Sequence, residues 1–401
     1  MPITRPQLIS DLTRAYRKAK RHKTRSRNVK DFERNLEENI NLLATELTER
    51  TYRPSSATCF VISDPKKREI FAADFRDRVV HHLYYDYTHI IFERSFIADS
   101  YSCIKGRGTH YGISRLQHHI RSCRQQTGEE PYVLKLDIKG YFMHINRKLL
   151  LQLVADRLTK AARQRVSSHS EVRWQDCLDF DFLLWLSGVI ILQDPTEGCI
   201  MRGKSADWDA LPNSKSLFYS QPDCGLPIGN LTSQLFSNVY LSEFDNFMKR
   251  RMKCRHYGRY VDDAFVVSHS RQQLNKLISE ARSFLFNHLG LVLHEGTTHI
   301  VPTRCGVEFL GAFLLPDRTY VAGKTLRRIT PKILALEQKV KHMPRNEVDV
   351  DHLRCSLSSF GGVLGHYDSY RIRLRLFSQL PTVCRYGAFD YNLLKFVPYP
   401  F

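Results

Sequence analysis

Two adjacent carboxylates interrupt an apolar stretch in the second half of the chain. The sequence Tyr260-Val261-Asp262-Asp263 lies between Tyr257-Gly258-Arg259 and Ala264-Phe265-Val266-Val267. The flanking residues favour β-structure, so the pattern predicts a hairpin over 258–270 with both aspartates at its tip. Carboxylates among apolar strand residues cost free energy unless water or a metal ion compensates them. Taken alone, these residues fit an ordinary acidic turn as well as a metal site.

A third acid ends an apolar segment further upstream. Pro131 to Ile138 (PYVLKLDI) has the composition of a buried strand and carries Asp137 near its end. Three acids at the ends of two neighbouring strands can hold two Mg²⁺ ions, which prefer oxygen ligands and retain substrate phosphates. Two such ions about 3.5–4 Å apart stabilise the attacking and leaving oxygens of a phosphoryl displacement. Asp137, Asp262 and Asp263 are therefore the candidate catalytic and metal-binding residues, with two Mg²⁺ ions as cofactor and Mn²⁺ as a substitute.

The remaining pattern predicts alternating helices and strands. Phe32, Leu36, Ile40, Leu43 and Leu47 share one face of a helix that begins near Asp31. A hairpin is expected over 51–73, with Asp64-Pro65-Lys66-Lys67 as its basic turn. Helices are expected over 75–92, from after Gly112 to about 124, and over 149–165, 180–192, 232–251 and 274–289, with further helices beyond 316. A strand is expected over 307–315. The central order of strand, helix, helix, hairpin, helix and strand indicates an α+β sheet with helices on one face.

The charge balance points to a polyanionic partner. The 401 residues include 60 Lys and Arg against 41 Asp and Glu, which gives a net charge of +19 and a pI near 9.5. Such an excess is typical of proteins that bind nucleic acid. A merely soluble basic protein and an acidic membrane surface as partner are the alternatives. The basic run from Arg17 to Arg27 fits either a solvated helix end or a surface that follows phosphates.

Neither a membrane span nor a cysteine-based site is expected. The most apolar run, Phe180 to Leu192, contains Asp181 and is shorter than the roughly 20 residues that a span requires. The N-terminus has no apolar signal-peptide core. The ten cysteines form no C-x-x-C pair, which argues against zinc, and a disulfide framework is not expected in so long a chain. We therefore expect reduced thiols in a cytoplasmic protein that does not contact a membrane.

Six ordered segments resemble the motifs of reverse transcriptases. LDIKGYF, GLPIGNLTSQLFSNVYL, YGRYVDDAFVV and VEFLGAFL are similar to four palm motifs. Upstream, REIFAADFRDRVVHH and SYSCIKGRGTHYGI are similar to the finger motifs of the bacterial, group-II-intron-related branch. The resemblance covers roughly residues 50 to 316. It implies RNA-templated DNA synthesis from deoxynucleoside triphosphates, with template RNA and a primer or complementary DNA as partners.

The same resemblance implies an α+β right-hand polymerase with fingers, a ferredoxin-like antiparallel palm and a C-terminal helical thumb. Residues 1–50 would be a basic, helical extension and 51–132 the fingers, completed by an insertion at 156–221. Residues 133–155 and 222–316 would form the palm, and 317–401 the thumb. The presence of all three acids argues against a non-catalytic RNA-binding protein on this scaffold.

One block departs from the common pattern. Most reverse transcriptases carry Q-G-x-x-x-S-P where this chain has Ile228-Gly229-Asn230-Leu231-Thr232-Ser233-Gln234. This form, and the upstream Trp208-x-x-Leu211-Pro212-x-x-Lys215-Ser216-Leu217-Phe218, resemble the enzymes of diversity-generating retroelements. That resemblance implies error-prone copying of a template-repeat RNA, with a small basic accessory protein as partner. A retron, phage-defence or intron-encoded, maturase-like enzyme of bacterial, archaeal or phage origin is the alternative.

The resemblance also assigns roles to individual residues. Asp137 and Asp262 match ligands of both metals, helped by the Ile138 carbonyl, and Asp263 matches the second catalytic carboxylate. Phe142 matches the bulky residue that excludes a 2′-OH, or is a core aromatic. The other assignments are Lys67, Arg68 and Arg76 to the triphosphate or to backbone phosphates, Ile228 and Gly229 to the nascent base pair, Phe309, Leu310 and Gly311 to a primer grip, and Lys105, Arg107, Ser233 and Gln234 to the template RNA.

One expected residue is absent. The family usually has a lysine near Gly296-Thr297 as general acid for pyrophosphate, but the local sequence is Leu293-His294-Glu295-Gly296-Thr297-Thr298-His299. His294 and His299 are candidates for that role, and a structural histidine is the alternative reading of each.

Overall fold

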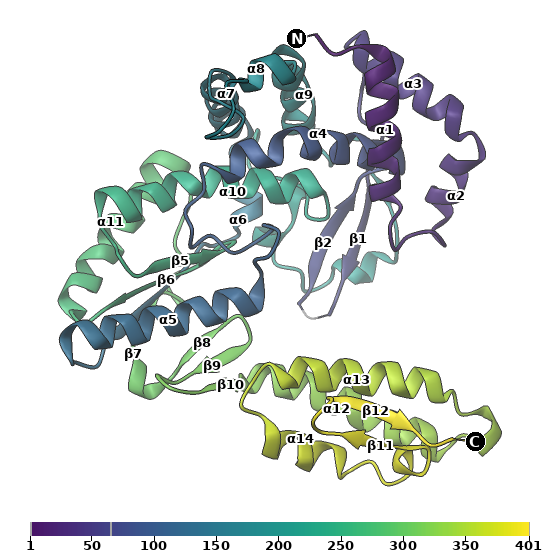
Figure 1. Cartoon of the computed structure of the whole chain (residues 1–401), viewed down its shortest axis with the longest axis vertical. Coiled ribbons are helices and arrows are strands. Elements are labelled where there is room, and N and C mark those ends of the chain that lie inside the picture. Colours follow the sequence, from purple (N-terminus) through teal and green to yellow (C-terminus); the bar gives the residue numbers. More distant parts are fainter. Residues whose placement is uncertain (1, 65, 401) are drawn as a thin grey trace.

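A four-stranded antiparallel sheet lies at the centre of the computed structural model, which describes residues 2–64 and 66–400 (Figure 1). Its strands, in spatial order, are β5 (Tyr257–Tyr260), β6 (Asp263–Ser268), β3 (Tyr132–Asp137) and β7 (His299–Pro302). Helices α7 (Arg147–Ala162) and α10 (Leu231–Asn246) come between β3 and β5, and α11 (Arg271–Leu289) connects β6 to β7. This is the β-α-β-β-α-β order of a ferredoxin-like sheet.

Helices cover both faces of this sheet. Successive strand residues point to opposite faces, and Leu134 and Leu136 of β3 pack into the core that includes α10 and α11. Val133 packs instead against the second face, with residues of α5 (Thr109–Thr127). The expectation of helices on one face was therefore wrong. The nearly continuous apolar sequence of β3 fits a strand that is covered on both sides.

The N-terminal region forms three helices rather than one. They are α1 (Arg5–Ala19), α2 (Arg27–Arg34) and α3 (Leu36–Thr48), and α1 and α2 pack against α4 (Phe75–Glu93). The helix expected from Asp31 is broken at Asn35, whose φ of −125° and ψ of 47° end α2. The basic run includes the C-terminal end of α1 and the loop after it. Lys18 in the last turn of α1 and Lys20 at its C-cap form ion pairs with Asp86 and Glu33.

A hairpin of β1 (Thr58–Ile62) and β2 (Arg68–Ala72) follows, with the short strand β4 (Ile200–Met201) parallel to β1 at the edge. The predicted hairpin is confirmed, although Pro65 of its turn lies outside the described residues. Helix α9 (Phe180–Leu192) has the predicted bounds and packs against α7. The long helix expected over 232–251 is α10 continued by a π-helical turn, η4 (Phe247–Arg251). Shorter elements are α6 (Tyr141–His144), α8 (Trp174–Cys177), η1 (Ser205–Trp208), η2 (Asn213–Lys215), η3 (Leu217–Tyr219), η5 (Thr303–Cys305), η6 (Arg345–Glu347) and η7 (Val383–Arg385).

The strand expected over 307–315 is a tight hairpin. Strands β8 (Val307–Phe309), β9 (Ala312–Leu314) and β10 (Thr319–Val321) form a small sheet that leads into the C-terminal region. That region has its own core, built mainly by α12 (Gly323–Lys341), α13 (Val350–Gly365) and α14 (Tyr370–Phe377). A further hairpin, β11 (Gly387–Asp390) with β12 (Lys395–Pro398), packs on α13, so the region is not purely helical.

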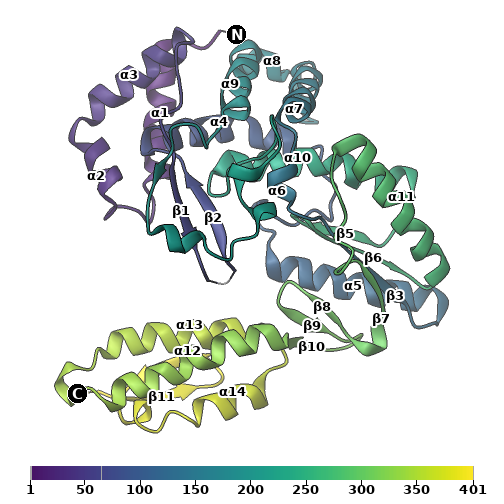
Figure 2. The same cartoon turned by 180° about the vertical axis from the view of Figure 1, so that it is seen from behind.

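The C-terminal region lies beyond the tip of the β1–β2 hairpin in both views (Figures 1 and 2). Lys332 Nζ of α12 lies 2.6 Å from Asp64 Oδ2 at that tip, so an ion pair connects the two regions. Among the described residues, no helix combines the length and the apolar character needed to cross a membrane.

Candidate active site

The three predicted aspartates meet at one end of the central sheet. Asp137, the last residue of β3, pairs directly with Asp263, the first residue of β6, and Asp263 pairs on its other side with Tyr260 of β5. Asp262 lies in the turn between β5 and β6. All three side chains are half-buried. The predicted hairpin with aspartates at its tip is confirmed, and the strand register brings the third acid to it.

The turn that carries Asp262 has an unusual backbone conformation. Val261 has a φ of 55°, and it is the only one of the two central turn residues with positive φ. A positive φ at this position alone is the pattern of a type II′ hairpin turn, where glycine is normally found. For a β-branched residue this conformation is a genuine outlier, and such strain gathers at functional sites. The turn is therefore held in place by contacts elsewhere in the molecule.

Burial and mutual repulsion disfavour the charged forms of two of the acids. Burial raises the pKa of Asp263 to about 7, Lys135 opposes the rise, and the nearby charges of Asp137 and Asp262 add to it. Burial and the charge of Asp137 likewise raise the pKa of Asp262. The Lys135 ammonium lies 3.9 Å from Asp263 Oδ1. The end of the sheet thus brings together acids whose mutual repulsion and burial the nearby basic side chains offset only in part.

The donor set fits a hard divalent cation. Asp263 Oδ1 is buried, and no hydrogen-bond partner is present for it among the described residues. In the described chain no three His, Cys, Asp or Glu side chains are arranged closely enough to hold a metal ion by themselves, and like-charged carboxylates repel one another. Mg²⁺ does not require a cage made only of protein, because it usually keeps waters and substrate phosphates among its ligands. Clustered carboxylates, one of them with a buried oxygen that accepts no hydrogen bond, are suited to such an ion.

Of the three residues predicted to contact the triphosphate, Arg68 lies near enough to the acids to affect one of their pKa values. The positive charge of Arg68 lowers the pKa of Asp262, and so does that of Lys66, which was not among the predicted contacts. Lys67 instead donates to the carbonyl oxygen of Asp209.

Arg76 is also engaged elsewhere. Its guanidinium pairs with Glu46 and lies 5.4 Å from the centre of the Tyr52 ring. The assignment of Arg76 to the triphosphate therefore disagrees with its contacts, which tie the first turn of α4 to α3.

Phe142 and Ile228 lie together next to the β1–β2 hairpin. Both are half-buried against a small apolar cluster that contains Phe71 of β2 and Met143. The backbone joins the same segments, since Phe71 N donates to Ile228 O at 3.1 Å and Leu226 N donates to Phe142 O at 2.8 Å. The Phe142 ring lies 5.3 Å from that of Tyr141 in an edge-to-face contact. Packing therefore accounts for part of both side chains.

Gly229 lies where the loop before α10 crosses β2. Its φ is 125°, and a Cβ there would lie 3.0 Å from Ile70 Cγ2. A side chain would therefore be strained and crowded at this position. In this structure, position 229 requires glycine because its backbone passes close to β2.

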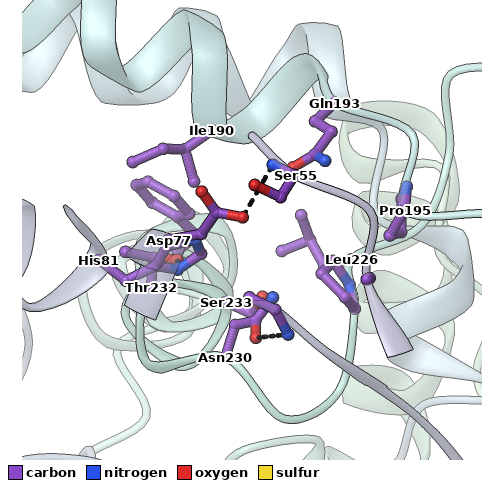
Figure 3. A pocket seen from close by; sticks show the side chains of 14 residues that line it. Ser55, Asp77, His81, Ile190, Gln193, Pro195, Leu226, Asn230, Thr232 and Ser233 are labelled. Carbon is purple, nitrogen blue, oxygen red and sulfur yellow. Dashed lines mark hydrogen bonds between the residues drawn. The ribbon is translucent and has the colours of Figure 1, made fainter. Parts of the chain in front are cut away.

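A polar pocket lies behind this loop, between α4, α9 and the start of α10 (Figure 3). Asp77 accepts from Tyr52 Oη at 2.7 Å and from Ser55 N at 2.8 Å, and His81 Nδ1 lies 2.7 Å from Thr232 Oγ1. Burial lowers the pKa of His81 to about 4, so it is neutral near pH 7. Ser233, which was predicted to contact RNA, lines this pocket and is buried. That assignment is corrected, because a hydroxyl inside the pocket is not on a surface that RNA can reach.

The other predicted nucleic-acid contacts lie in three places. Gln234 and Lys105 are exposed. Arg107 donates to the carbonyl oxygens of Ser100 and Ile97, at 2.8 and 3.3 Å, and so braces its own loop. The proposed primer-grip residues form the β8–β9 turn, where Leu310 and Gly311 have φ values of 49° and 85° and Phe309 pairs with Ala312. Two positive φ values in a two-residue turn are the type I′ pattern.

Thr297, which was not predicted from the sequence, bonds directly to one of the acids. Thr297 Oγ1 donates to Asp137 Oδ2 at 2.8 Å, and His294 N donates to the Asp137 carbonyl at 2.8 Å. These contacts come from the segment where a lysine was expected. The imidazoles of His294 and His299 are exposed, and His299 Nδ1 contacts the Thr297 carbonyl at 2.7 Å.

Lys135 could have been found from the sequence. It precedes Asp137 by two positions on a strand, so both side chains lie on one face of the sheet. Thr297 carried no comparable local signal.

Comparison with known proteins agrees with this geometry. The sequence model of the family described as Reverse transcriptase (RNA-dependent DNA polymerase) matches residues 64–314, which include all three aspartates. Protein YkfC of Escherichia coli (strain K12) is 25% identical over 314 residues, which is 70% of this chain and 72% of YkfC.

Solved telomerase structures share the fold. A telomerase from Candida albicans in complex with the TWJ fragment of telomeric RNA has a TM-score of 0.50 and 13% sequence identity, over 84% of this chain and 56% of that chain. An apo telomerase from Candida tropicalis has a TM-score of 0.47 and 11% identity, over 82% of this chain and 62% of that chain. This chain thus spans less than two thirds of the length of these telomerases. The first likeness concerns the fold alone, and it shows the expected α+β right-hand polymerase.

Proposed function

Because the chain belongs to the reverse transcriptase (RNA-dependent DNA polymerase) family, we propose that it copies an RNA template into complementary DNA at the Asp137–Asp262–Asp263 site. The observation that carries this proposal is the pairing of Asp137 with Asp263 beside a hairpin turn that holds Asp262. Two strand carboxylates with a third from the adjacent turn are suited to hold the metal ions of a phosphoryl transfer. The basic excess of the chain fits a nucleic-acid substrate.

The acids and the carbonyl of Ile138 would hold Mg²⁺, which when bound supplies positive charge to the attacking and leaving oxygens of the transfer. Arg68 and Lys66 place further positive charge next to the acids and suit a triphosphate. Thr297 orients Asp137 through its hydrogen bond. The exposed part of the Phe142 ring would lie beneath the sugar and exclude a 2′-OH.

We further assign the central sheet and its helices (133–155 and 222–316) to the palm, 51–132 with 156–221 to the fingers, and 317–401 to the thumb. The separate C-terminal core supports the last boundary. Residues 1–50 are the N-terminal extension, built from α1, α2 and α3.

Within the family, we favour the error-prone enzyme of a diversity-generating retroelement, working with a small basic accessory protein. The motif around Trp208 supports this, because it is built into the fingers. Glu69 of β2 is buried and accepts from Trp208 Nε1 at 2.9 Å, from Ser216 Oγ at 3.1 Å and from Leu217 N at 2.8 Å. A buried carboxylate of β2 therefore holds three residues of this motif against the β1–β2 hairpin. The alternatives are a retron, phage-defence or intron-encoded enzyme.

Primer extension tests the proposed function. Purified protein is supplied with an RNA template, a DNA primer, the four deoxynucleoside triphosphates and Mg²⁺. Asp262→Ala and Asp137→Ala should abolish synthesis while RNA binding persists, and Asp351→Asn, at a solvent-exposed acid of α13, is the matched control. Appreciable synthesis by either alanine variant would refute the site. Sequencing the products made on a cognate template-repeat RNA separates the retroelement enzyme from the alternatives, because only the former predicts a high error rate.

A further inference from the structure

A fully buried ion pair lies under the turn that carries Asp262. Arg259 of β5 is 1% exposed and Asp245 of α10 is fully buried. Two bonds join them, from Arg259 Nε to Asp245 Oδ1 and from Nη2 to Oδ2, each at 2.7 Å. Tyr257 Oη donates to the same carboxylate at 2.6 Å. The pair is thus bidentate, and Tyr257 gives its acceptor a third donor.

The third nitrogen of this guanidinium reaches the strained turn. Arg259 Nη1 donates to the carbonyl oxygen of Val261 at 2.8 Å. On the other side of the same residue, Val261 N donates to Ser102 Oγ at 3.3 Å. The peptide units flanking the residue with φ of 55° are therefore both held, and Asp262 and Asp263 follow it directly in the chain.

The backbone of Arg259 is itself fixed. Arg259 N donates to the Asp99 carbonyl at 2.9 Å, and the Arg259 carbonyl accepts from Tyr101 N at 3.0 Å. Both the backbone and the guanidinium of Arg259 are therefore held by hydrogen bonds between α10 and the turn. A lysine could satisfy the charge of Asp245, but its single ammonium lacks the planar fork that binds a carboxylate bidentately and still offers a third directed donor.

We propose that Arg259 is a positioning residue for the catalytic turn, and that the Arg259–Asp245 pair holds Val261 in its positive-φ conformation so that Asp262 and Asp263 are oriented to bind metal. Burying an ion pair for stability alone has little advantage, since a well-packed apolar pair is often equally stable. The guanidinium also donates a hydrogen bond to the Val261 carbonyl oxygen, which an apolar side chain at position 259 could not do. The inference rests on the proposed function, because it concerns the same three acids.

Two variants test the proposal. Arg259→Lys keeps the charge but loses the fork. The double variant Asp245→Asn with Arg259→Met removes both charges together and leaves an amide oxygen as acceptor for Tyr257. Because it buries no unpaired charge, it tests the proposal even if Arg259→Lys fails to fold. Tyr257→Phe is the matched control, because it removes a bond to Asp245 and leaves the bond to Val261 intact. Each protein is assayed for Mn²⁺ binding by calorimetry without nucleic acid, for the half-saturating Mg²⁺ concentration and kcat in primer extension, and for thermal unfolding.

We expect Arg259→Lys and the double variant to weaken Mn²⁺ binding and raise the Mg²⁺ requirement by about 10- to 100-fold, the usual effect of losing a group that orients metal ligands. Tyr257→Phe should retain both properties. Metal binding by the double variant as tight as in the wild type, or equal losses in Arg259→Lys and Tyr257→Phe, would overturn the proposal.

A second comparison asks whether the effect passes through Val261. Glycine adopts positive φ without strain, so Arg259→Lys should cost a smaller factor in metal binding when Val261→Gly is also present. An equal factor in both backgrounds would show that Arg259 acts independently of the turn. Absence of synthesis by the wild-type protein would instead count against the proposed function, and the Mn²⁺ measurements would still decide the role of Arg259.

Discussion

Asp137 and Asp263 are directly opposed in the β3–β6 ladder, at the end where Tyr260 of β5 also meets Asp263. Like charges directly opposite each other destabilise a sheet, and the Lys135 ammonium, 3.9 Å from Asp263 Oδ1, is the cation of β3 that offsets them. The arrangement costs stability in the absence of a cation, and the same cost makes cation binding favourable.

The first prediction concerns the pH dependence of stability. The pKa of Asp263 is about 7 in the folded chain and about 3.9 when unfolded, so the folded state binds the proton more tightly. The contribution of this group to the free energy of unfolding is therefore highest below about pH 4, falls as the pH rises towards 7, and is constant above it. In EDTA at pH 8, Asp263→Asn should raise the free energy of unfolding by about 1–3 kcal/mol, a range reduced for the 28% exposure of this side chain.

Urea unfolding of both proteins at pH 5 and pH 8 checks this prediction. The difference between them should be larger at pH 8. The same titration should appear in metal binding, because a proton competes with the ion for the carboxylate. The half-saturating Mg²⁺ concentration should therefore rise as the pH falls from 8 to 6. A stability difference that does not depend on pH would show that Asp263 is ionised throughout.

The second prediction concerns Thr297. Thr297→Val keeps the shape of the side chain and removes the bond from Oγ1 to Asp137 Oδ2. One hydrogen bond is worth about 0.5–1.5 kcal/mol, so kcat/KM in primer extension should fall about three- to tenfold. Thr298→Val is the control, because Thr298 Oγ1 has no hydrogen-bond partner among the described residues. Equal activity of the two variants would remove Thr297 from the site.

The third prediction concerns discrimination between sugars. Phe142→Ala should increase ribonucleotide incorporation, because the truncated side chain no longer occupies the volume of a 2′-OH. It should also lower stability, since the ring is half-buried against Tyr141 and Met143. Met143→Ala is the control, because it removes a buried neighbour and should destabilise the chain without changing discrimination. If Phe142→Ala only destabilises, the ring is a core residue.

The fourth prediction concerns fidelity. If Ile228 lies against the nascent base pair, as the family resemblance implies, Gln at position 228 would supply an amide that donates and accepts hydrogen bonds near the templating base. The Ile side chain can offer only an apolar surface there. Ile228→Gln should lower misincorporation opposite adenine about three- to tenfold without large loss of activity, and Ile228→Val should leave the error spectrum unchanged. Deep sequencing of products from a template with all four bases measures both. Because Ile228 packs on the cluster with Phe71, lower stability with an unchanged error spectrum is the outcome expected if packing is its only role.

Much of the local structure could be predicted from the sequence. The bounds of α9 and the hairpins at β1–β2 and β5–β6 follow from periodicity, composition and turn residues, because side-chain direction repeats every 3.6 residues in a helix and every two in a strand. The region 1–50 was predicted to be helical, but the bounds of α1 were not predicted, although Leu8, Leu12 and Tyr16 carry the same spacing. The break at Asn35 interrupts an apolar stripe that continues across it, so periodicity alone could not reveal it.

The candidate site, too, was predictable only in part. The sequence by itself determined which acids and cations are available, and that Asp262 and Asp263 lie at a hairpin tip. Only the tertiary structure decided that Asp137 faces Asp263, that Thr297 bonds to Asp137, that Arg76 turns to Glu46, and that Arg259 reaches from Asp245 to the turn. Local periodicity depends on neighbours within a few residues. These contacts depend instead on strand order and on helix packing across the whole chain, and no spacing within one segment encodes them.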